Sequence, residues 1–303
     1  MGLRYARPMI TLDETVSTHR PCESHPAARG TYRSTNVVVL LFAALLITGC
    51  PMDEKFIFFP SAEIESTPKN FGVDYADVYF TTADGVKLNG WLALKPGAQT
   101  TLLWFHGNGG NISHRARGLK PLRDRLDANV FMIDYRGYGR SEGSASEKGT
   151  YEDAEAALSY LTGRSDIDSK RIVFFGQSLG SAVAADLAGR HDCLAIILEA
   201  PFASIPAMAK AIYPWLPVGA LIRTRYDVIE KVKKIKAPLL VVHGDKDDIV
   251  PFEQGRRVFD AATGPKEFHA LGGAHHNDTF EVGGDAYFQV MRDFIERAGN
   301  SRK

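Results

Sequence analysis

A serine between two glycines is the first group in this chain that could act as a nucleophile. Gly176-Gln-Ser178-Leu-Gly180 has the spacing G-x-S-x-G, in which the glycines leave room for a very tight turn from strand to helix. The preceding residues, Ile172 to Phe175, are aromatic or β-branched, as is typical of a strand buried on both faces. The following residues, Leu179 to Leu187, are rich in alanine and leucine and contain no proline, which favours a helix. The pattern therefore places Ser178 at the start of a helix, where free backbone N–H groups stabilise negative charge.

A nucleophilic serine needs a histidine that accepts its proton and a carboxylate that orients the histidine. After an elbow of this kind, the carboxylate comes next in the chain and the histidine follows it. Two later loops carry such residues, and each follows a predicted strand. The candidates are Asp245, Asp247 and Asp248 on the first loop, and His275 and His276 on the second. Spacing alone does not choose among the three aspartates or between the two histidines.

The elements that must position these loops alternate between strands and helices. An antiparallel pair of strands surrounds the turn signal Ala83-Asp84-Gly85. All predicted strands are Ala76–Thr81, Val86–Ala93, Thr101–Phe105, Asn129–Ile133, Ile172–Phe175, Leu194–Leu198, Leu239–Val242 and Glu267–Leu271. The predicted helices lie within Ile112–Leu126 and at Tyr151–Leu161, Leu179–Leu187, Phe252–Ala262 and Tyr287–Ala298. This order indicates an α/β fold with one mostly parallel, eight-stranded sheet and helices on both faces, whose active site lies beyond the carboxyl ends of the strands.

Several motifs together resemble the α/β-hydrolase superfamily. They are Gly176–Gly180, His243-Gly-x-x-Asp247-x-x-Val-Pro251, His276-Asn-Asp-Thr279, His106-Gly-Asn-Gly-Gly-Asn111, Asp134-Tyr-Arg-Gly-Tyr-Gly139 and Ser141-Glu-Gly143. More narrowly, they resemble the serine-aminopeptidase-like "Hydrolase 4" group and its Bem-type members, over roughly residues 78–294. The resemblance implies the α/β-hydrolase fold and a catalytic triad, and it says much less about the substrate.

The resemblance also implies which residues complete the triad. Matched to the motifs, the acid is Asp247 and the base is His276. Glu199 is the reserve candidate for the acid, because it ends the preceding strand, where a few members of the superfamily place theirs. The other two aspartates are then expected to cap a helix or face solvent, and His275 to line its loop.

The glycine-rich stretch after the strand Thr101–Phe105 is expected to bind the oxyanion. Backbone amides can approach a substrate oxygen there with no side chain between, and each such donor is worth on the order of 10²–10³ in rate. We expect the N–H groups of Leu179 and, by resemblance, of Asn108 to form the oxyanion hole. No metal and no cofactor are expected, since the histidines are not spaced as metal ligands.

The segment Pro201–Pro238 is too long for a simple crossover between two strands. It clusters apolar residues and is broken by Pro206, Pro214 and Pro217. We expect a small cap of short helices above Ser178 that shapes an apolar acyl pocket. The alternative is an apolar crossover packed wholly into the core.

The N-terminal region contains a wholly apolar run from Val37 to Ile47. Eleven residues rise about 16 Å as a helix, roughly half the thickness of a bilayer core, so the run suits a signal peptide rather than a membrane span. The residues Leu46-Ile-Thr-Gly-Cys50 resemble the lipobox of bacterial lipoproteins, in which the cysteine becomes the lipidated N-terminus. Because Pro51 stands where inner-membrane lipoproteins often carry aspartate, the resemblance favours the outer membrane, facing the periplasm. The alternative is a plain secretory signal with a chance cysteine.

These expectations divide the chain into a lipoprotein signal peptide that is removed (1–49), a tether (50–75) and a hydrolase domain (76–303) with its cap at about 201–238. Lys+Arg and Asp+Glu are equal at 36 each, so the charge balance gives no sign of a nucleic-acid partner. The three cysteines are too widely spaced for a disulfide framework.

The leading hypothesis is a membrane-tethered serine hydrolase that cleaves acyl esters, an esterase or lysophospholipase-like enzyme. Its partners would be a small-molecule or lipid acyl substrate and, through the lipid anchor, the membrane; the sequence carries no signal for an oligomeric state. One alternative is a thioesterase or aminopeptidase on the same triad. A second alternative, from a different class, is a binding lipoprotein that keeps the hydrolase fold without turnover.

Overall fold

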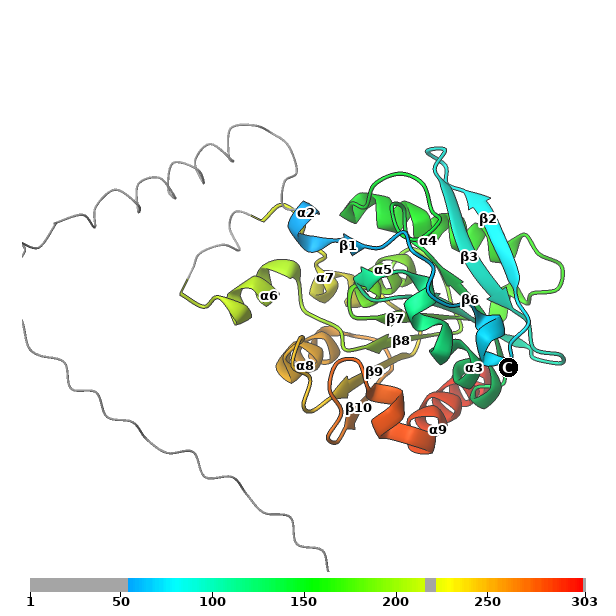
Figure 1. The fold of residues 1–303 in the computed structure, drawn as a ribbon. Coiled ribbons are helices and arrows are strands. Elements are labelled where there is room, and N and C mark those ends of the chain that lie inside the picture. Colours follow the sequence, from blue (N-terminus) through cyan, green and yellow to red (C-terminus); the bar gives the residue numbers. More distant parts are fainter. Residues whose placement is uncertain (1–53, 216–221, 302–303) are drawn as a thin grey trace, which may run out of the picture. The chain divides into compact units, whose positions relative to one another are not determined.

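A computed structural model of the protein describes residues 54–215 and 222–301. Within these residues, eight strands form one sheet in the order β10-β9-β8-β7-β4-β6-β3-β2 (Figure 1). Their bounds are β2 (Ala76–Thr81), β3 (Lys87–Ala93), β4 (Thr100–Phe105), β6 (Ala128–Ile133), β7 (Ile172–Gln177), β8 (Ala195–Glu199), β9 (Leu239–Gly244) and β10 (Lys266–Leu271). β3 runs antiparallel to both of its neighbours, and the other pairings are parallel. The predicted α/β fold with a mostly parallel, eight-stranded sheet is confirmed.

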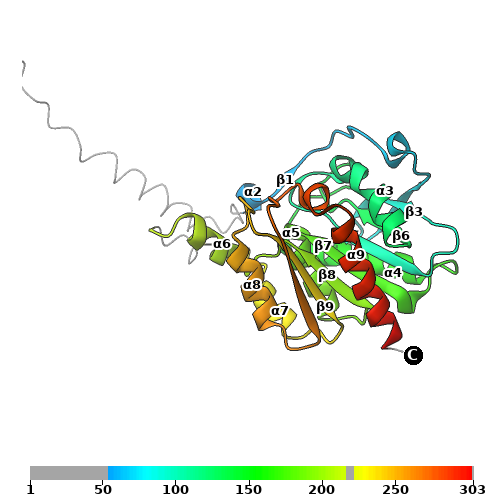
Figure 2. The ribbon, with the colours of Figure 1, turned by 90° about the horizontal axis from the view of Figure 1, so that it is seen from below.

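Helices cover both faces of this sheet. The helices of the described residues are α2 (Glu54–Ile57), α3 (Ala116–Arg125), α4 (Glu147–Thr162), α5 (Leu179–Ala188), α6 (Ile205–Ile212), α7 (Val228–Val232), α8 (Phe252–Ala261) and α9 (Thr279–Asn300), with short 3₁₀ helices η1 (Pro68–Phe71), η2 (Ile112–Arg115) and η3 (Ser169–Arg171). α3 and α9 lie side by side against one face of the sheet, as both views show (Figures 1 and 2). α4, α5, α7 and α8 pack on the opposite face.

The central strands are buried on both faces, as their nearly continuous apolar sequences predict. Every residue of β4 is buried, and successive side chains alternate between the two cores because the strand has a period of two. Leu103 and Phe105 join the core beneath α4 and α5, whereas Leu102 and Trp104 join the core beneath α3 and α9. Both cores thus hold the same strands in place, and with them the loops at their carboxyl ends.

α9 begins eight residues earlier than the sequence indicates. Its first turns are separated from the rest by Gly284, which has φ 51° and ψ −139°. The pair Gly283-Gly284 interrupts the helical pattern of the sequence. The sequence therefore predicts only the part of α9 that follows these glycines. The early start matters, because it brings Thr279 and Phe280 close to the site described below.

Residues 54–75 are packed on the domain, although their sequence suggested a tether. Phe59–Pro60 forms a short strand, β1, that pairs in parallel with β5 (Gly109–Gly110). Phe58 is buried and meets Tyr226 edge to face, with ring centroids 6.2 Å apart. The pairing uses backbone groups and single anchoring side chains, which leave no periodic pattern in the sequence.

The region expected to form a cap, 201–238, divides into two parts around residues 216–221, which lie outside the described structure. α7 packs against α5 and buries Val228 and Val232 in the core. α6 has no buried residue, and Trp215 beyond it is 77 % exposed.

The predicted signal peptide, 1–49, and the predicted lipidation site, Cys50, also lie outside the described residues. Within the described part of the chain, none of the helices combines the length and the apolar character that a membrane span requires.

Candidate active site

Ser178 lies at a strained turn between β7 and α5. Its backbone has φ 50° and ψ −115°, a conformation that costs a non-glycine residue on the order of 1–3 kcal/mol. The turn is held by hydrogen bonds from the Ser178 N–H to the Glu199 carbonyl oxygen (2.9 Å) and from the Ser181 N–H to the Ser178 carbonyl oxygen (2.9 Å). The surrounding structure therefore imposes the strain on Ser178.

The glycines on either side of Ser178 are needed because the backbone is crowded there. A Cβ atom on Gly176 would lie 2.3 Å from the carbonyl oxygen of Gly180, and one on Gly180 would lie 2.0 Å from the carbonyl oxygen of Phe105. Both distances are far below van der Waals contact, and both contacts are with backbone, which cannot move aside. This supports the reason given above for the G-x-S-x-G spacing.

Asp247 and His276 are brought together from the loops after β9 and β10. Nδ1 of His276 lies 2.7 Å from Oδ2 of Asp247. The other carboxylate oxygen, Oδ1, accepts hydrogen bonds from the backbone N–H groups of Ile249 (2.9 Å) and Val250 (2.8 Å). The carboxylate is fully buried, so its orientation toward the histidine is fixed.

A second histidine also contacts this carboxylate. Nε2 of His243 lies 3.3 Å from Oδ2 of Asp247 and 3.0 Å from the carbonyl oxygen of Val250. Burial alone would raise the pKa of Asp247, but the hydrogen bonds from His243 and His276 outweigh it and hold that pKa well below its usual range. Asp247 is therefore a carboxylate throughout the neutral pH range. The sequence motifs predicted no role for His243, although a polar residue in an otherwise apolar strand was a signal for one.

The neighbouring candidates have other partners. Asp245 accepts a hydrogen bond from the N–H of Gly273 (2.7 Å), which ties the two loops together. Asp248 and His275 are both exposed and face each other at 3.7 Å. The hydrogen bond to a histidine that lines the cavity therefore distinguishes Asp247 from the other two aspartates.

Glu199, the reserve candidate for the acid, is buried at the end of β8. Its carboxylate accepts hydrogen bonds from Nε2 of Gln177 (2.8 Å), Oγ1 of Thr279 (2.9 Å) and the hydroxyl of Tyr287. In the described part of the chain these donors are all neutral, and none is a histidine. Glu199 thus lines the cavity, whereas Asp247 occupies the position of the acid beside His276.

The loop expected to bind the oxyanion lies next to Ser178. A Cβ atom on Gly107 would lie 3.5 Å from Cβ of Ser178. The Asn108 side chain is engaged away from the backbone: Oδ1 accepts hydrogen bonds from the Tyr138 hydroxyl (2.9 Å) and the Phe59 N–H (3.3 Å), and Nδ2 donates to the Ile57 carbonyl oxygen. Leu179 is the first residue of α5, and the first N–H groups of a helix have no partner within it.

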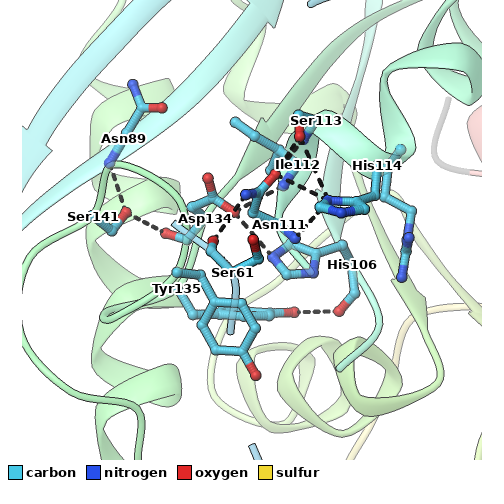
Figure 3. Close-up of polar contacts among 12 residues, drawn as sticks. Ser61, Asn89, His106, Asn111, Ile112, Ser113, His114, Asp134, Tyr135 and Ser141 are labelled. Carbon is cyan, nitrogen blue, oxygen red and sulfur yellow. Dashed lines mark hydrogen bonds and ion pairs between the residues drawn. The ribbon is translucent and has the colours of Figure 1, made fainter. Parts of the chain in front are cut away.

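A buried polar cluster supports this loop from the side of β6 (Figure 3). Nδ1 of His106 donates to the carbonyl oxygen of Gly107 (2.6 Å), and Nε2 of the same ring lies 3.4 Å from Oδ1 of Asp134. The Tyr135 hydroxyl donates to the carbonyl oxygen of His106 (2.8 Å). The motifs around residues 106 and 134 thus lie in contact, and Asp134 and Tyr135 hold the loop that begins at His106 in position.

The N-terminal segment also contacts this loop. Nδ2 of Asn111 donates to the carbonyl oxygens of Ser61 (2.9 Å) and Glu63 (2.6 Å). The N–H of Ser61 donates to the carbonyl oxygen of Gly110 (3.0 Å). Residues 57–63 are therefore part of the site's support, which the sequence did not indicate.

A cavity of about 550 Å³ opens in front of Ser178. Ser178, His276 and Asn108 line it together, with Arg115, Glu199 and Phe280 among the other lining residues. The described residues of the 201–238 region contribute nothing to its lining; α3, α9 and the loops do. Among the described residues the cavity lies between α3, α9 and the loops. The expected cap includes residues 216–221, which lie outside the described residues, so an acyl pocket beneath it stays a prediction.

Known proteins resemble this chain over most of its length. A family model for the alpha/beta hydrolase fold matches residues 100–221. Protein bem46 of Schizosaccharomyces pombe is 38 % identical over 262 residues, which cover 80 % of this chain and 85 % of that protein. The alpha/beta hydrolase domain-containing protein WAV2 of Arabidopsis thaliana is 34 % identical over 285 residues, which cover 86 % of this chain and 92 % of that protein.

Solved structures show the same fold. The esterase Pf2001 of Pyrococcus furiosus superposes with a TM-score of 0.66 at 24 % identity and covers 78 % of this chain and 98 % of its own. The two relatives, each more than 30 % identical over most of both chains, show the family to which the chain belongs. The chain belongs to the α/β-hydrolase family.

Proposed function

We propose that the protein is a serine hydrolase that cleaves acyl esters through an acyl-enzyme formed on Ser178. The observation that carries the proposal is the hydrogen bond between His276 and the buried, ionised Asp247, on the same cavity as the strained Ser178. A histidine held in this way presents its other ring nitrogen to the cavity as a base.

The mechanism follows from these positions. Oγ of Ser178 attacks the acyl carbonyl carbon while Nε2 of His276 takes its proton, and Asp247 stabilises the imidazolium that forms. The N–H groups of Leu179 and Asn108 bind the oxyanion. Collapse of the tetrahedral intermediate expels the alcohol, which takes the proton from His276. Water then attacks the acyl-enzyme, giving its proton to His276, and collapse of the second intermediate releases the acid and returns the proton to Ser178.

We favour esters over other acyl compounds as the substrate class because proteins with a similar fold are named esterases. Pf2001 is one of them, and an acetyl xylan esterase from Paenibacillus sp. R4, at 20 % identity and a TM-score of 0.60, is another. The same groups could cleave a thioester or an amide, so a thioesterase or aminopeptidase remains the nearest alternative. A binding module without turnover is disfavoured by the Asp247–His276 hydrogen bond, since binding alone requires no oriented base.

The envelope location is a separate part of the proposal. It rests on the lipobox-like residues that end at Cys50. Lipidation there would attach the enzyme to a bacterial membrane, with the outer membrane facing the periplasm as the favoured site.

Hydrolysis of p-nitrophenyl butyrate by a soluble chain that begins at Pro51 tests the catalytic proposal. Ser178→Ala should lower turnover by at least about 10³-fold, because loss of the nucleophile leaves only the oxyanion hole and binding. Ser159→Ala is the matched control, since this serine is exposed on α4. More than a tenth of the wild-type rate in a folded Ser178→Ala variant would contradict the proposal. The rates of hydrolysis of a thioester and an anilide with the same acyl group, compared with that of the ester, show which of the three bond types the enzyme prefers.

A further inference from the structure

Arg115 lies beside the nucleophile but has no part in the mechanism above. It ends η2 and lines the cavity together with Ser178 and His276. A methyl group built on Gly107 would lie 3.5 Å from Cβ of Ser178 and 3.8 Å from Nη2 of Arg115. The guanidinium therefore lies close to the position where an ester would react.

This guanidinium has no carboxylate partner among the described residues. Within residues 54–215 and 222–301, its hydrogen bond runs from Nη2 to the carbonyl oxygen of Gly109 (3.1 Å). Both basic neighbours are paired: Nε2 of His114 lies 3.2 Å from Glu65, and Arg117 contacts Glu281. Arg115 thus differs from the arginine two residues later, which lines the same cavity.

The setting of Arg115 favours an anionic ligand. Burial lowers its pKa from the usual value, as desolvation disfavours a charge. A guanidinium carries five N–H donors in a planar fork that fits a carboxylate or a phosphate, and the Gly109 carbonyl leaves most of them unused. A partly desolvated charge without a counter-charge is costly, and an anion in the cavity would remove that cost.

Glu199 does not supply the missing counter-charge. Its carboxylate also lines the cavity, but its oxygens accept hydrogen bonds from Gln177, Thr279 and Tyr287. No contact between it and Arg115 occurs in the described part of the chain.

We propose that Arg115 binds an anionic group of the substrate, a carboxylate or a phosphate, and that the enzyme prefers esters bearing such a group over neutral esters of the same size. The proposal rests on the hydrolase function proposed above. The competing explanation is that Arg115 only positions the loop through the Gly109 carbonyl, in which case charge on the substrate has no effect.

Selectivity for charge separates these explanations. In the first arm, the anionic acyl group of mono-p-nitrophenyl glutarate is compared with the neutral p-nitrophenyl valerate. In the second, a 1-acylglycerol 3-phosphate is compared with the matching 1-acylglycerol, so that an anion on the leaving group is tested separately. The quantity measured is the ratio of kcat/KM for the anionic ester to that for the neutral ester.

In at least one arm, Arg115→Met should lower this ratio about 10- to 100-fold, since a charge-assisted, bidentate pair is lost. Arg115→Lys should lower the ratio less, because lysine keeps the positive charge although it lacks the planar, bidentate guanidinium. Arg125→Met is the matched control and should change the ratio by less than about threefold, since this arginine has Asp285 as its partner and is not among the residues that line the cavity.

An equal loss on anionic and neutral esters in both arms would show that Arg115 is a positioning residue and would overturn the proposal. A ratio unchanged by Arg115→Met would overturn it as well. If the wild type cleaves neutral esters with Ser178 but shows no Arg115-dependent selectivity, only this inference fails. If it cleaves no ester at all, the proposed function fails with it.

Inhibition of the wild-type enzyme tests the anion site without any substitution. Glutarate should inhibit hydrolysis of p-nitrophenyl valerate competitively, and added salt should weaken the inhibition. Valeramide, which is neutral, should inhibit at least tenfold less well. Equal inhibition by the two compounds would contradict an anion site.

Discussion

Oδ2 of Asp247 lies 2.7 Å from Nδ1 of His276, while Oδ1 is held by two backbone N–H groups of its own loop. The carboxylate is thus fixed by the protein before it orients the histidine. The amide oxygen of an asparagine could keep both backbone hydrogen bonds, but its NH2 group would then face Nδ1 of His276 and favour the wrong tautomer of the imidazole.

Asp247→Asn should therefore lower kcat for a p-nitrophenyl ester by about 10⁴-fold. Asp245→Asn and Asp248→Asn should stay within about tenfold of the wild type, because the first only ties two loops together and the second is exposed. Steady-state kinetics on the three variants check this. A comparable loss in all three, or a larger loss in Glu199→Gln, would mean that the acid is misplaced.

The low pKa of Asp247 also predicts a pH dependence of stability. Its pKa is lower in the folded protein than in the unfolded chain, where an aspartate has a pKa of about 3.9. The stabilisation from its charge is then fully present above that pH and is lost as the pH falls toward the folded value. The difference in free energy of unfolding between the wild type and Asp247→Asn should therefore be smaller at about pH 3 than at about pH 5. Urea titrations across this range measure it, and a difference that grows on acidification would be contrary to this account.

The crowding at Gly180 predicts a large effect on stability. A Cβ there would lie 2.0 Å from the carbonyl oxygen of Phe105, so Gly180→Ala should lower the free energy of unfolding by about 3 kcal/mol or prevent folding. Gly109→Ala is the control, since no atom of the described residues lies within 4 Å of a Cβ there. Urea denaturation compares them, and equal stabilities would show that the elbow is less crowded than described.

The fold could be predicted largely from local patterns. Strands such as β4 are continuous apolar runs, and the Gly176–Gly180 elbow is a short segment whose steric demands are visible in its own residues. The choice of Asp247 could not come from spacing, because three aspartates share one loop and the partner lies 29 residues later; resemblance supplied it.

The misjudged parts are those whose structure depends on distant contacts. Residues 57–63 are held through their backbone groups. The side-chain amides of Asn108 and Asn111 donate to two of their carbonyl oxygens, and one N–H donates to the carbonyl oxygen of Gly110; such bonds leave no trace in composition. Arg115 sits in a single 3₁₀ turn without apolar periodicity, so only the folded structure brings it beside Ser178. The first turn of α9 contributes Thr279 and Phe280 to the cavity lining. The sequence did not predict this turn, because it precedes the glycines that interrupt the helical pattern.

The location can be tested through Cys50. Two or more acyl chains give stable anchoring at about 0.8 kcal/mol per buried CH₂, so the mature protein in a bacterial host should stay with membranes in high salt and be released by detergent. Cys50→Ser should abolish the acyl modification and leave an unprocessed precursor or a soluble product. Mass spectrometry of the mature N-terminus measures this. An unmodified terminus at any other residue would refute the lipoprotein proposal and leave the hydrolase proposal intact.

If Ser178 is a nucleophile activated by His276, its Oγ should react with a fluorophosphonate. Intact-mass and peptide mass spectrometry of the chain that begins at Pro51 should show one adduct per molecule, located on Ser178. The adduct should be absent in Ser178→Ala and should form at least about 10²-fold more slowly in His276→Ala, which lacks the base. No adduct on a folded wild-type protein, or an adduct on another serine, would contradict the account.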